Sequence, residues 1–309
     1  MTEAAAERCF LVLPHTGRED SKRAAVATIA SLQAAGAVPV LAPGDLAELR
    51  ETDPIAERCA VLGQDVPLER VELAIVLGGD GTILRAAETV RATDVPIIGV
   101  NLGHVGFLAE VEREDLDDVV HRAIDRDYDV EERMAIDVVV LDPHGQEIYR
   151  TWALNEATVE KSTPGKMIEV VIEVGGRPLS TFGCDGVVMA TPTGSTAYAF
   201  SAGGPVVWPN IDAMLMVPLS AHALFARPLV VAPTTVLAVE LLDDSITPGI
   251  LWCDGRRSTP LEPGARVEVS RSTVPVRLAR LSRGKFTDRL VQKFDLPVAG
   301  WRGSLGQTR

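Results

Sequence analysis

Val71-Glu-Leu-Ala-Ile-Val-Leu-Gly-Gly-Asp-Gly-Thr-Ile-Leu-Arg85 joins an apolar run to a glycine turn and then to a helical pattern. Residues 73–77 are all apolar, so they predict a buried strand, which Gly78 and Gly79 end. From residue 83 onward, apolar side chains recur at helical spacing. In a strand, turn and helix of this kind, backbone N–H groups and the helix N-terminus point at an anion. The stretch therefore predicts a phosphate-binding turn, with Asp80 as its one ionisable side chain.

Asp80 has two interpretations that this turn leaves open. Asp and Thr are good N-cap residues, so Asp80 or Thr82 can serve only to begin the helix. Alternatively, the carboxylate has a catalytic role beside a bound phosphate. The turn is neither the dinucleotide fingerprint G-x-G-x-x-G nor a P-loop, because no Gly-Lys-Ser/Thr follows it. Other parts of the sequence must decide between a structural and a catalytic aspartate.

The N-terminal part alternates predicted strands and helices around this turn. Strands are predicted over residues 9–13, 38–41, 73–77 and 95–100. Helices are predicted over 21–35, 46–50 and 115–128, and one more begins at 83. This alternation predicts an α/β domain with a doubly wound parallel sheet over residues 1–128. We expect the C-terminal tail, residues 285–309, to join this domain as a helix or arm.

From about residue 130 the spacing of apolar residues changes from that of helices to that of strands. Two hairpins are predicted, 136–141 with 148–152 and 167–174 with 178–182. Further short strands are predicted over 187–190, 214–217, 236–242, 250–252, 266–270 and 276–281, with one helix after Thr196. These strands predict a C-terminal all-β domain over residues 129–284, built as a sandwich-like pair of sheets or an irregular barrel.

Composition and charge restrict the kind of partner. The chain of 309 residues is 46% hydrophobic and 24% charged, which is typical of a globular protein with one or two cores. Its formal net charge of -13 argues against binding nucleic acid or anionic membranes. No apolar run approaches the ~20 residues of a membrane-spanning helix. Four scattered cysteines and a polar N-terminus without a signal-like apolar core predict a cytoplasmic protein without disulfides or a zinc site.

Further polar segments lie in the C-terminal part. Asn155 and Glu156 follow the first hairpin; Asn can pair with an adenine edge, and a carboxylate suits two ribose hydroxyls. Cys184-Asp-Gly186 and Thr191-Pro-Thr-Gly-Ser-Thr196 precede the short helix, and the second supplies four hydroxyls where a cap needs one. Each segment also has a structural interpretation: an exposed carboxylate at the end of a strand, a helix cap, and a solvated hairpin tip for Trp252-Cys-Asp-Gly-Arg-Arg257.

Taken together and in this order, the motifs resemble the NAD kinase family, whose members phosphorylate NAD with ATP or polyphosphate. The Gly78-Gly-Asp-Gly-Thr82 turn alone also resembles diacylglycerol-type lipid kinases and phosphofructokinases. The specific signal is its combination with Gly103-His-Val-Gly-Phe107, Asn155-Glu156, Cys184-Asp-Gly186, Thr191-Pro-Thr-Gly-Ser-Thr-Ala-Tyr198 and Cys253-Asp-Gly255. The resemblance covers nearly the whole chain, about residues 11–303.

The resemblance implies how the N-terminal motifs act. Asp80 would be the base that accepts the proton of the 2′-hydroxyl on the adenosine ribose of NAD. Gly79 and Gly81 would let the donor's phosphates approach the backbone, and Arg85 would supply positive charge to them. Phe107 would line the adenine side. An aspartate can accept the proton late in phosphoryl transfer, because the reaction depends mainly on positioning and charge neutralisation.

The resemblance also implies a dinucleotide site in the C-terminal domain, in a cleft between the two domains. Asn155 and Glu156 would hold adenine and ribose, and Asp185 would hold the nicotinamide end. Dinucleotide contacts in the adenine and ribose pocket are implied for Thr196, Ala197, Tyr198, Ala199, Phe200 and Ser201. Further contacts are implied for Lys166, Gly183 and Arg256.

The same resemblance implies Mg²⁺ or another divalent cation bound with the substrate, and ATP or polyphosphate as the phosphoryl donor. It implies a homotetramer or homodimer whose C-terminal β domain binds NAD and makes the subunit contacts. NAD and ATP are the expected small-molecule substrates, with no nucleic acid and no membrane as partner. Two rival hypotheses stay open: a lipid kinase that shares the glycine turn, and a nucleotide-sensing module that needs the pocket but not Asp80.

Overall fold

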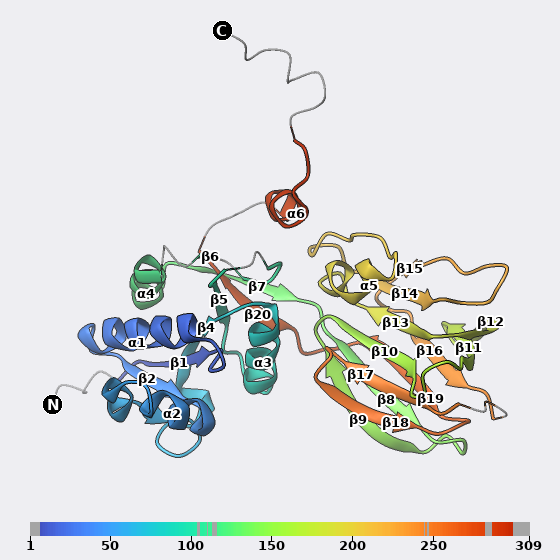
Figure 1. The fold of residues 1–309 in the computed structure, drawn as a ribbon, viewed down its shortest axis with the longest axis horizontal. Coiled ribbons are helices and arrows are strands. Elements are labelled where there is room, and N and C mark those ends of the chain that lie inside the picture. Colours follow the sequence, from blue (N-terminus) through green and yellow to red (C-terminus); the bar gives the residue numbers. More distant parts are fainter. Residues whose placement is uncertain are drawn as a thin grey trace, which may run out of the picture. The chain divides into compact units, whose positions relative to one another are not determined.

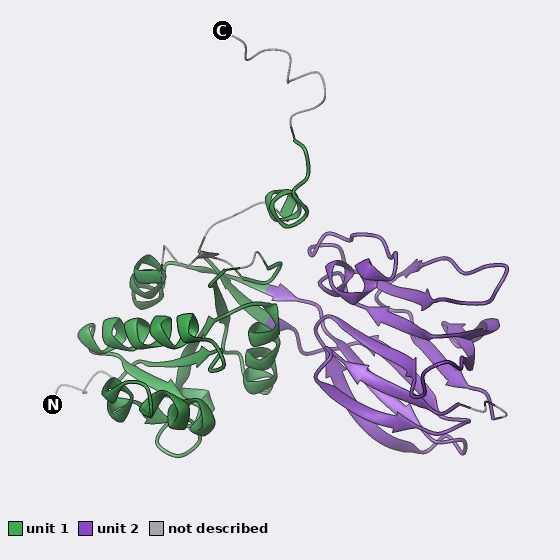
Figure 2. Ribbon diagram, in the orientation of Figure 1, with its two compact units in different colours: residues 1–131, 277–309 green, residues 132–276 purple. Residues whose placement is uncertain are grey.

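A computed structural model describes residues 7–103, 106–109, 111–112, 116–243, 245, 247–281 and 286–298. Four parts of the sequence predictions lie outside the described residues: His104, Val105, the first residue of the helix predicted from 115, and tail residues 285 and 299–309. The chain divides into two compact units, shown in Figure 2. Unit 1 comprises Met1–Glu131 and Arg277–Arg309, and unit 2 comprises Glu132–Val276.

Unit 1 is built on an eight-stranded sheet of order β3-β2-β1-β4-β5-β20-β7, with β6 paired to β5 (Figure 1). Its strands are β1 (Cys9–Pro14), β2 (Val38–Leu41), β3 (Ala60–Val61), β4 (Val71–Leu77), β5 (Ile97–Asn101), β6 (Val111–Glu112), β7 (Asp129–Arg133) and β20 (Val276–Arg280). Its helices are α1 (Glu19–Ala34), α2 (Pro43–Arg50), α3 (Asp80–Val90), α4 (Leu116–Asp125) and α6 (Phe286–Phe294), with the short 3-10 helices η1 (Pro54–Arg58) and η2 (Leu68–Arg70). None of these described helices is long and apolar enough to cross a membrane.

The direction of chain winding reverses between β1 and β4. The β1–α1–β2 crossover runs toward one edge of the sheet, whereas the β4–α3–β5 crossover runs toward the other. Because parallel crossovers are right-handed, α1 and α3 cover opposite faces of the sheet. This arrangement confirms the predicted doubly wound α/β class. It also makes the carboxyl ends of β1 and β4 the switch point at which such sheets bind ligands.

The central strands of unit 1 are buried on both faces, which explains their continuous apolar runs. On one face, Phe10 and Ile75 belong to a core that also contains Ile29 of α1 and side chains from α2 and α4. On the other face, α3 packs so closely that a Cβ at Gly99 of β5 would lie 2.5 Å from Ile83 Cδ1. The strand, turn and helix at residues 71–85 therefore form the middle of this unit.

We expected the strand over residues 276–281 to belong to the all-β domain, and this assignment is wrong. The strand is present as β20, but Leu278 pairs in parallel with Ile97 of β5, in the sheet of unit 1. Its side chains are mostly buried, as they are in strands of both units, so the apolar pattern could not show which sheet it joins. The chain leaves unit 1 through β7 and returns to it with β20.

Unit 2 contains two six-stranded sheets whose paired strands are antiparallel. The first has the order β15-β14-β13-β10-β17-β18, with β10 (Glu156–Lys161), β13 (Gly186–Ala190), β14 (Met214–Leu219), β15 (Leu229–Val231), β17 (Gly249–Cys253) and β18 (Arg257–Leu261). The second has the order β12-β11-β16-β19-β8-β9, with β8 (Ile136–Leu141), β9 (Glu147–Ala153), β11 (Ile168–Val174), β12 (Arg177–Cys184), β16 (Leu237–Leu241) and β19 (Arg266–Arg271). The short helices η4 (Gly194–Thr196) and α5 (Tyr198–Ser201) follow β13.

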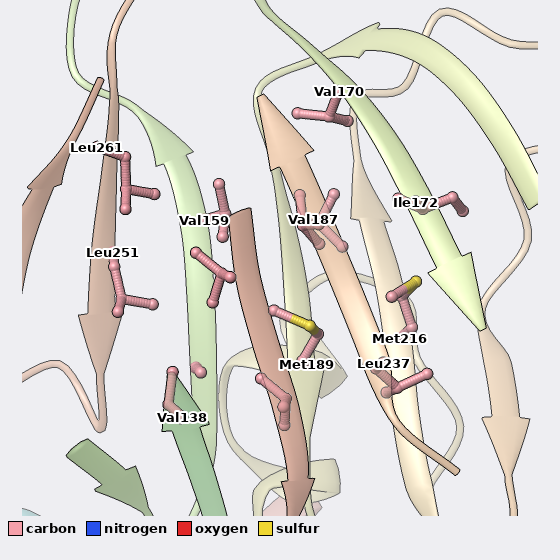
Figure 3. Close-up of a cluster of buried hydrophobic side chains, with 14 of the residues drawn as sticks. Val138, Val159, Val170, Ile172, Val187, Met189, Met216, Leu237, Leu251 and Leu261 are labelled. Atoms are coloured by element: carbon pink, nitrogen blue, oxygen red, sulfur yellow. The ribbon is translucent and has the colours of Figure 1, made fainter. Parts of the chain in front are cut away.

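The two sheets of unit 2 share one apolar core (Figure 3). Alternate residues of both sheets point into it, such as Val159 and Met189 from the first sheet and Val170 from the second. The outer face of the first sheet is covered as well, because Val188 packs with Ala199 of α5. This sandwich confirms the predicted class of the C-terminal domain, and it fixes the segment after β13 against the sheet.

Several short strands were not predicted. β10 begins at Glu156, whereas the structural interpretation of the sequence placed this carboxylate at the end of a strand. β15 and β18 were missed as well. β18 contains Pro260, which is typical of a strand end, but β18 is an edge strand, and an edge tolerates a residue without an N–H. The missed strands do not change the fold class, but without them the sequence could not predict which residues hold the backbone of residues 154–156.

Candidate active site

Asp80 is the first residue of α3, and its carboxylate faces a neighbouring turn instead of capping its own helix. Oδ2 accepts a hydrogen bond from the Phe107 N–H and Oδ1 accepts one from the Leu108 N–H, each at 3.1 Å. The N-cap residue is Gly79, and no side chain makes a capping bond there. The interpretation of Asp80 or Thr82 as the helix cap is therefore wrong. Two N–H groups from the turn after β5 fix the aspartate.

The glycines around Asp80 serve two different purposes. A Cβ at Gly106 would lie 2.3 Å from Asp80 Oδ1, so this glycine allows the fold itself to close around the carboxylate. At Gly79 and Gly81, in contrast, no described atom beyond the chain neighbours and the helix's own backbone lies within 4 Å of the place where a Cβ would stand. Packing does not require glycine at these two positions, and their bare backbone is open to a ligand.

A cavity of about 80 Å³ lies beside this turn, at the carboxyl ends of β1, β4 and β5. Its volume suits a phosphate group and is far below the roughly 300–1,000 Å³ of pockets that hold whole ligands. Arg18 supplies a cation at the start of α1, and the lining also includes His15, Asp20, Ser21, Gly78, Gly79, Asn101, Leu102 and Gly103. The segment after β1 was not among the predicted site residues. This segment could have been predicted from its position directly after the first strand, because that strand borders the switch point.

Arg85 lies one turn along α3, and its guanidinium is engaged with protein groups. Nη1 is 2.8 Å from Oδ1 of Asp45 in α2, and Nη2 donates to Pro14 O at 2.5 Å. Asp45 is 5% exposed, and its Oδ2 has no hydrogen-bond partner among the described residues. Arg85 therefore compensates a buried carboxylate and ties α3 to α2 and to the end of β1. Its predicted role toward phosphates stays a prediction.

The ring of Phe107, which was predicted to line the adenine side, is buried within unit 1. The residue is 8% exposed, and its ring centroid lies 6.0 Å from that of Phe286 and 5.9 Å from that of Phe294. Both partners belong to α6, and tilted aromatic pairs at these distances are favourable. The backbone of Phe107, and not its ring, reaches Asp80. Contact of the ring with adenine stays a prediction.

In unit 2, a carboxylate from the β17–β18 hairpin holds the turn between β9 and β10. Asp254 Oδ2 accepts from the Leu154 N–H at 2.9 Å, and Oδ1 accepts from the N–H groups of Asn155 and Glu156 at 2.7 and 3.4 Å. Burial raises the pKa of Asp254, and these N–H groups oppose the shift. Asp254 is therefore an internal support for the predicted nucleotide-binding turn, and the interpretation as a solvated tip is wrong for this residue, although Gly255 and Arg256 beside it are exposed.

Arg257 completes this support from the start of β18. Its Nη2 is 2.9 Å from Asp254 Oδ2, and its Nη1 donates to Thr151 Oγ1 at 3.0 Å. The guanidinium also lies over the Trp152 ring, 4.7 Å from the centroid. The side chain of Asp254 is 2% exposed, so the ion pair is largely removed from water. The two arginines of this turn thus differ, because Arg256 is exposed.

Glu156 is buried, with 7% exposure, and lies among other acidic groups. Burial raises the pKa of its carboxyl to about 8, and the nearby carboxylates of Asp254 and Glu160 add to the shift. The Tyr198 N–H donates a hydrogen bond to the carboxyl and opposes the shift. Oε2 has no hydrogen-bond partner among the described residues. A buried carboxyl oxygen without a partner is costly, so Glu156 is a candidate ligand-binding group.

The hydroxyl-rich segment after β13 uses its side chains on backbone groups. Thr191, Ser195 and Thr196 each donate from Oγ to a backbone carbonyl, at 2.6, 2.7 and 3.2 Å. A Cβ at Gly194 would lie 2.0 Å from Asn155 O, so the segment packs directly on the turn that precedes β10. Of the two interpretations left open by the sequence, the structural one therefore accounts for these hydroxyls. They shape the segment that carries Tyr198.

Asp185 and Gly183 lie at the end of β12, close to β14 and the segment after it. Asp185 Oδ1 is 2.5 Å from Lys161 Nζ, and this hydrogen bond holds the pKa of Asp185 below its usual range. Gly183 forms an isolated bridge with His222, whose N–H donates to its carbonyl at 2.9 Å. Lys166, also a predicted contact, is exposed. The structure thus places Asp185 in an ion pair and leaves its predicted role open.

The short helix α5 carries two exposed aromatic rings, and one of them, Tyr198, belongs to the residue that bonds to the buried acid Glu156. Tyr198 and Phe200 are 39% and 38% exposed, whereas Ala199 between them is buried. Partial burial raises the pKa of Tyr198, and the carboxylates of Glu160, Glu156 and Asp185 add to the shift. Of the predicted contacts in unit 2, the structure therefore brings Glu156 and Tyr198 together directly. Ser201 is exposed and Ala197 is half-buried.

Both units match known proteins of one family. The sequence matches the ATP-NAD kinase N-terminal domain over residues 45–128 and the ATP-NAD kinase C-terminal domain over residues 154–281. The NAD kinase of Leifsonia xyli subsp. xyli (strain CTCB07) is 60% identical over 304 residues, which cover 98% of this chain and 99% of that protein.

Solved structures support the same fold. The crystal structure of yeast NADH kinase complexed with NADH has a TM-score of 0.83 at 22% identity, over 94% of this chain and 88% of that one. The NAD kinase from Archaeoglobus fulgidus in complex with ATP has a TM-score of 0.70 at 25% identity, over 94% of this chain and 100% of that one.

An aspartate beside an open glycine turn at a switch point suits an enzyme that binds nucleotides, and so does a buried carboxyl oxygen of the sandwich without a hydrogen-bond partner among the described residues. The matches over both units narrow this class further. The chain belongs to the NAD kinase family, as the motifs predicted.

Proposed function

We propose that this chain transfers the terminal phosphoryl group of ATP to the 2′-hydroxyl of the adenosine ribose of NAD, and that Asp80 accepts the hydroxyl proton. Family membership and the 60% identity to a named NAD kinase support the reaction. The observation that carries the role of Asp80 is its carboxylate, which two backbone N–H groups hold beside a bare glycine backbone.

The reaction asks little covalent work of the protein. The ribose 2′-oxygen bonds to the γ-phosphorus, the bond from that phosphorus to the β–γ bridging oxygen breaks, and the proton passes to Asp80. Such a transfer depends on positioning and charge neutralisation, and the proton leaves late, so a carboxylate suffices as acceptor. The N–H groups of Phe107 and Leu108 occupy only part of the lone pairs of Asp80. A positioned acceptor of this kind contributes about 10²–10⁴-fold in rate.

We assign NAD to unit 2. Because the pKa of Glu156 is about 8, the group is protonated at pH 7 and can both donate to and accept from a ribose hydroxyl. Its Oε2, which has no hydrogen-bond partner among the described residues, supports this role. Asn155 precedes Glu156 in the same turn and suits an adenine edge. The exposed rings of Tyr198 and Phe200 offer stacking surfaces, and Asp185 is assigned to the nicotinamide end.

We assign the donor's phosphates to the glycine turn of unit 1. The open backbone at Gly79 and Gly81, the N-terminus of α3 and the Arg18 guanidinium all favour negative charge. Mg²⁺ or another divalent cation would accompany the phosphates as part of the substrate and offset their charge near Asp80. Polyphosphate presents the same phosphate groups and is the alternative donor.

We further propose that the protein acts in the cytoplasm as a homotetramer or homodimer. Leu224 and Phe225 of unit 2 are adjacent and exposed at 111% and 57%, which supports a contact with another subunit. The four cysteines are buried free thiols, as suits a reducing compartment. Sedimentation velocity at micromolar concentration should show a species of at least twice the chain mass, and a monomer would contradict the assembly.

The reaction is tested with purified protein, Mg²⁺, NAD and ATP labelled at the γ-phosphate. We expect the label to appear in NADP, which an NADP-specific dehydrogenase then identifies. Parallel reactions with polyphosphate determine whether it replaces ATP, and diacylglycerol vesicles test the lipid-kinase alternative. Saturable NAD binding by calorimetry with no NADP from either donor would instead indicate a nucleotide-sensing module.

A further inference from the structure

The two N–H groups that hold Asp80 belong to a short turn, residues 106–109, that follows β5. The turn lies against the aspartate, because a Cβ at Gly106 would be only 2.3 Å from Asp80 Oδ1. Phe107 and Leu108 are 8% and 3% exposed, so the turn is buried. Whatever fixes this turn therefore also fixes the orientation of the Asp80 carboxylate.

Two arginines hold the opposite side of the turn. Arg289 of α6 donates from Nη1 to Phe107 O at 3.0 Å. Arg280 of β20 donates from Nη1 to Leu108 O at 3.3 Å, and an ion pair with Glu131 of β7, 2.8 Å from Nε to Oε2, anchors it. Both carbonyls thus accept charge-assisted hydrogen bonds, which are about twice as strong as neutral ones.

Arg289 is linked to Asp80 through a single peptide group. The carbonyl of Phe107 and the N–H of Leu108 belong to the same planar unit. Arg289 donates to the oxygen of this unit, and its N–H donates to Asp80 Oδ1. A cation at the carbonyl polarises the peptide and strengthens its N–H as a donor. Arg280 bonds to the next carbonyl, whose peptide unit makes no bond with Asp80 among those described.

Aromatic contacts seat α6 on the same turn. Phe286 and Phe294 lie with their ring centroids 6.0 and 5.9 Å from that of Phe107. Arg289 lies one helical turn after Phe286, so both side chains occupy the same face of α6. The aromatic contacts therefore bring the guanidinium to the carbonyl that it bonds.

We propose that Arg289 is a positioning residue for phosphoryl transfer: from α6 it fixes the peptide between Phe107 and Leu108, and through this peptide the carboxylate of Asp80. The proposal rests on the proposed role of Asp80 as proton acceptor. It gives the C-terminal helix a function in the reaction, and it predicts an effect on kcat and not on the affinity for NAD or ATP.

The test compares the full-length wild type with Arg289→Met, Arg289→Lys and Gln292→Ala. Gln292 is exposed on the same helix and provides the matched control. We expect Arg289→Met to lower kcat about 10- to 100-fold, as displacement of a catalytic group does, with little change in either KM. Arg289→Lys should recover part of the loss, because an ammonium group can still donate to the Phe107 carbonyl. Gln292→Ala should match the wild type.

The backbone amide of Leu108 provides a readout that does not depend on turnover. Its proton resonance reports on the hydrogen bond to Asp80, and Asp80→Ala gives the reference shift for the bond's loss. We expect the Leu108 amide proton to move upfield in Arg289→Met, toward that reference, and to stay unchanged in Gln292→Ala.

Wild-type kcat in Arg289→Met with an unmoved Leu108 amide would overturn the proposal. So would equal losses of kcat and melting temperature in the Met and Lys variants without movement of this amide, because that is the pattern of a purely structural arginine. Full turnover in Asp80→Asn would reject the role of Asp80 itself. An inactive Asp80→Asn beside a fully active Arg289→Met would reject only the positioning role.

Discussion

At the scale of single residues, the buried carboxyl of Glu156 makes stability depend on pH. Its pKa is about 8 in the folded protein, against an ordinary value of 4.5. Between these values the folded state keeps a proton that the unfolded state has lost. The free energy of unfolding therefore falls as pH rises through this window, by at most about 1.4 kcal/mol per pH unit.

Replacing Glu156 with Gln removes this ionisation, so the melting temperature of Glu156→Gln relative to the wild type should increase from pH 5 to pH 8.5. Thermal unfolding followed by circular dichroism measures the difference. Glu169→Gln, which alters an exposed carboxylate of the same unit, is the control and should show no such trend. An equal difference at both pH values would contradict the buried, protonated Glu156.

Gly81 and Gly44 are a matched pair of positions, and alanine substitutions there distinguish an effect on stability from an effect on ligand binding. Each is the second residue of its helix, and at neither position does a described atom beyond the chain neighbours and the helix's own backbone lie within 4 Å of the place where a Cβ would stand. Alanine should therefore keep or raise stability at both positions, by up to about 1 kcal/mol. We expect Gly81→Ala to raise the KM for ATP about tenfold, the cost of losing some 1.4 kcal/mol of binding, whereas Gly44→Ala keeps it. Equal KM values in steady-state assays would mean that no phosphate approaches Gly81.

At the scale of elements, the turn between β9 and β10 depends on a carboxylate from another hairpin. In Asp254→Asn only one oxygen remains to accept from the N–H groups of residues 154–156, so at least one buried donor loses its partner. We expect a loss of about 1–3 kcal/mol in the free energy of unfolding. Because the turn carries Asn155 and Glu156, the Kd for NAD should also rise about tenfold or more.

Urea unfolding and calorimetry with NAD measure the two effects of Asp254→Asn. Asp212→Asn breaks an exposed ion pair with Arg271 in the same unit and should change neither quantity measurably. Unchanged NAD affinity in Asp254→Asn, at reduced stability, would show that the turn is not part of the NAD site.

At the scale of the whole molecule, the residues of unit 2 are inserted between two parts of unit 1, so the last strand of the unit 1 sheet follows unit 2 in the sequence. Deleting residues 276–309 removes β20 from its place beside β5 and β7, whereas deleting residues 282–309 removes α6 and keeps β20. We expect the longer deletion to unfold unit 1 and spare unit 2, since the strand pairings of β20 among the described residues are all within the sheet of unit 1. The shorter deletion should preserve both folds and lower kcat. Hydrogen exchange separates the cases, and a protected β5 in the longer deletion would contradict the observed pairing.

The parts of the molecule that could be predicted are those whose information is local. The strand, turn and helix at residues 71–85 are indicated by an apolar run, two glycines and helical spacing within one short stretch. The sheet that β20 joins could not be predicted in this way, because its pairing with β5 links residues far apart in the sequence. The hydrogen bonds from Asp254 to the turn before β10 and from Arg289 to Phe107 could not be predicted for the same reason, because they also join residues far apart in the sequence.

For Asp80, the sequence predicted the location of the residue but not its hydrogen-bond partners. The sequence placed it in a phosphate-binding turn, but the chemistry of that turn alone favoured a helix cap over a catalytic group. Only the two N–H groups from residues 107 and 108 decide against the cap, and they come from the next turn of the sheet. The family resemblance, carried by several motifs together, supplied what the single turn lacked.

The most direct test of Asp80 as the proton acceptor is the turnover of Asp80→Asn, with the Kd for NAD determined on the same preparation. We predict that NADP formation with ATP and Mg²⁺ falls by about 10²-fold or more, the usual contribution of a positioned proton acceptor. The Kd for NAD should stay close to that of the wild type, because NAD is assigned to groups of unit 2. Turnover equal to that of the wild type, at unchanged NAD affinity, would contradict the assignment of Asp80 as the proton acceptor.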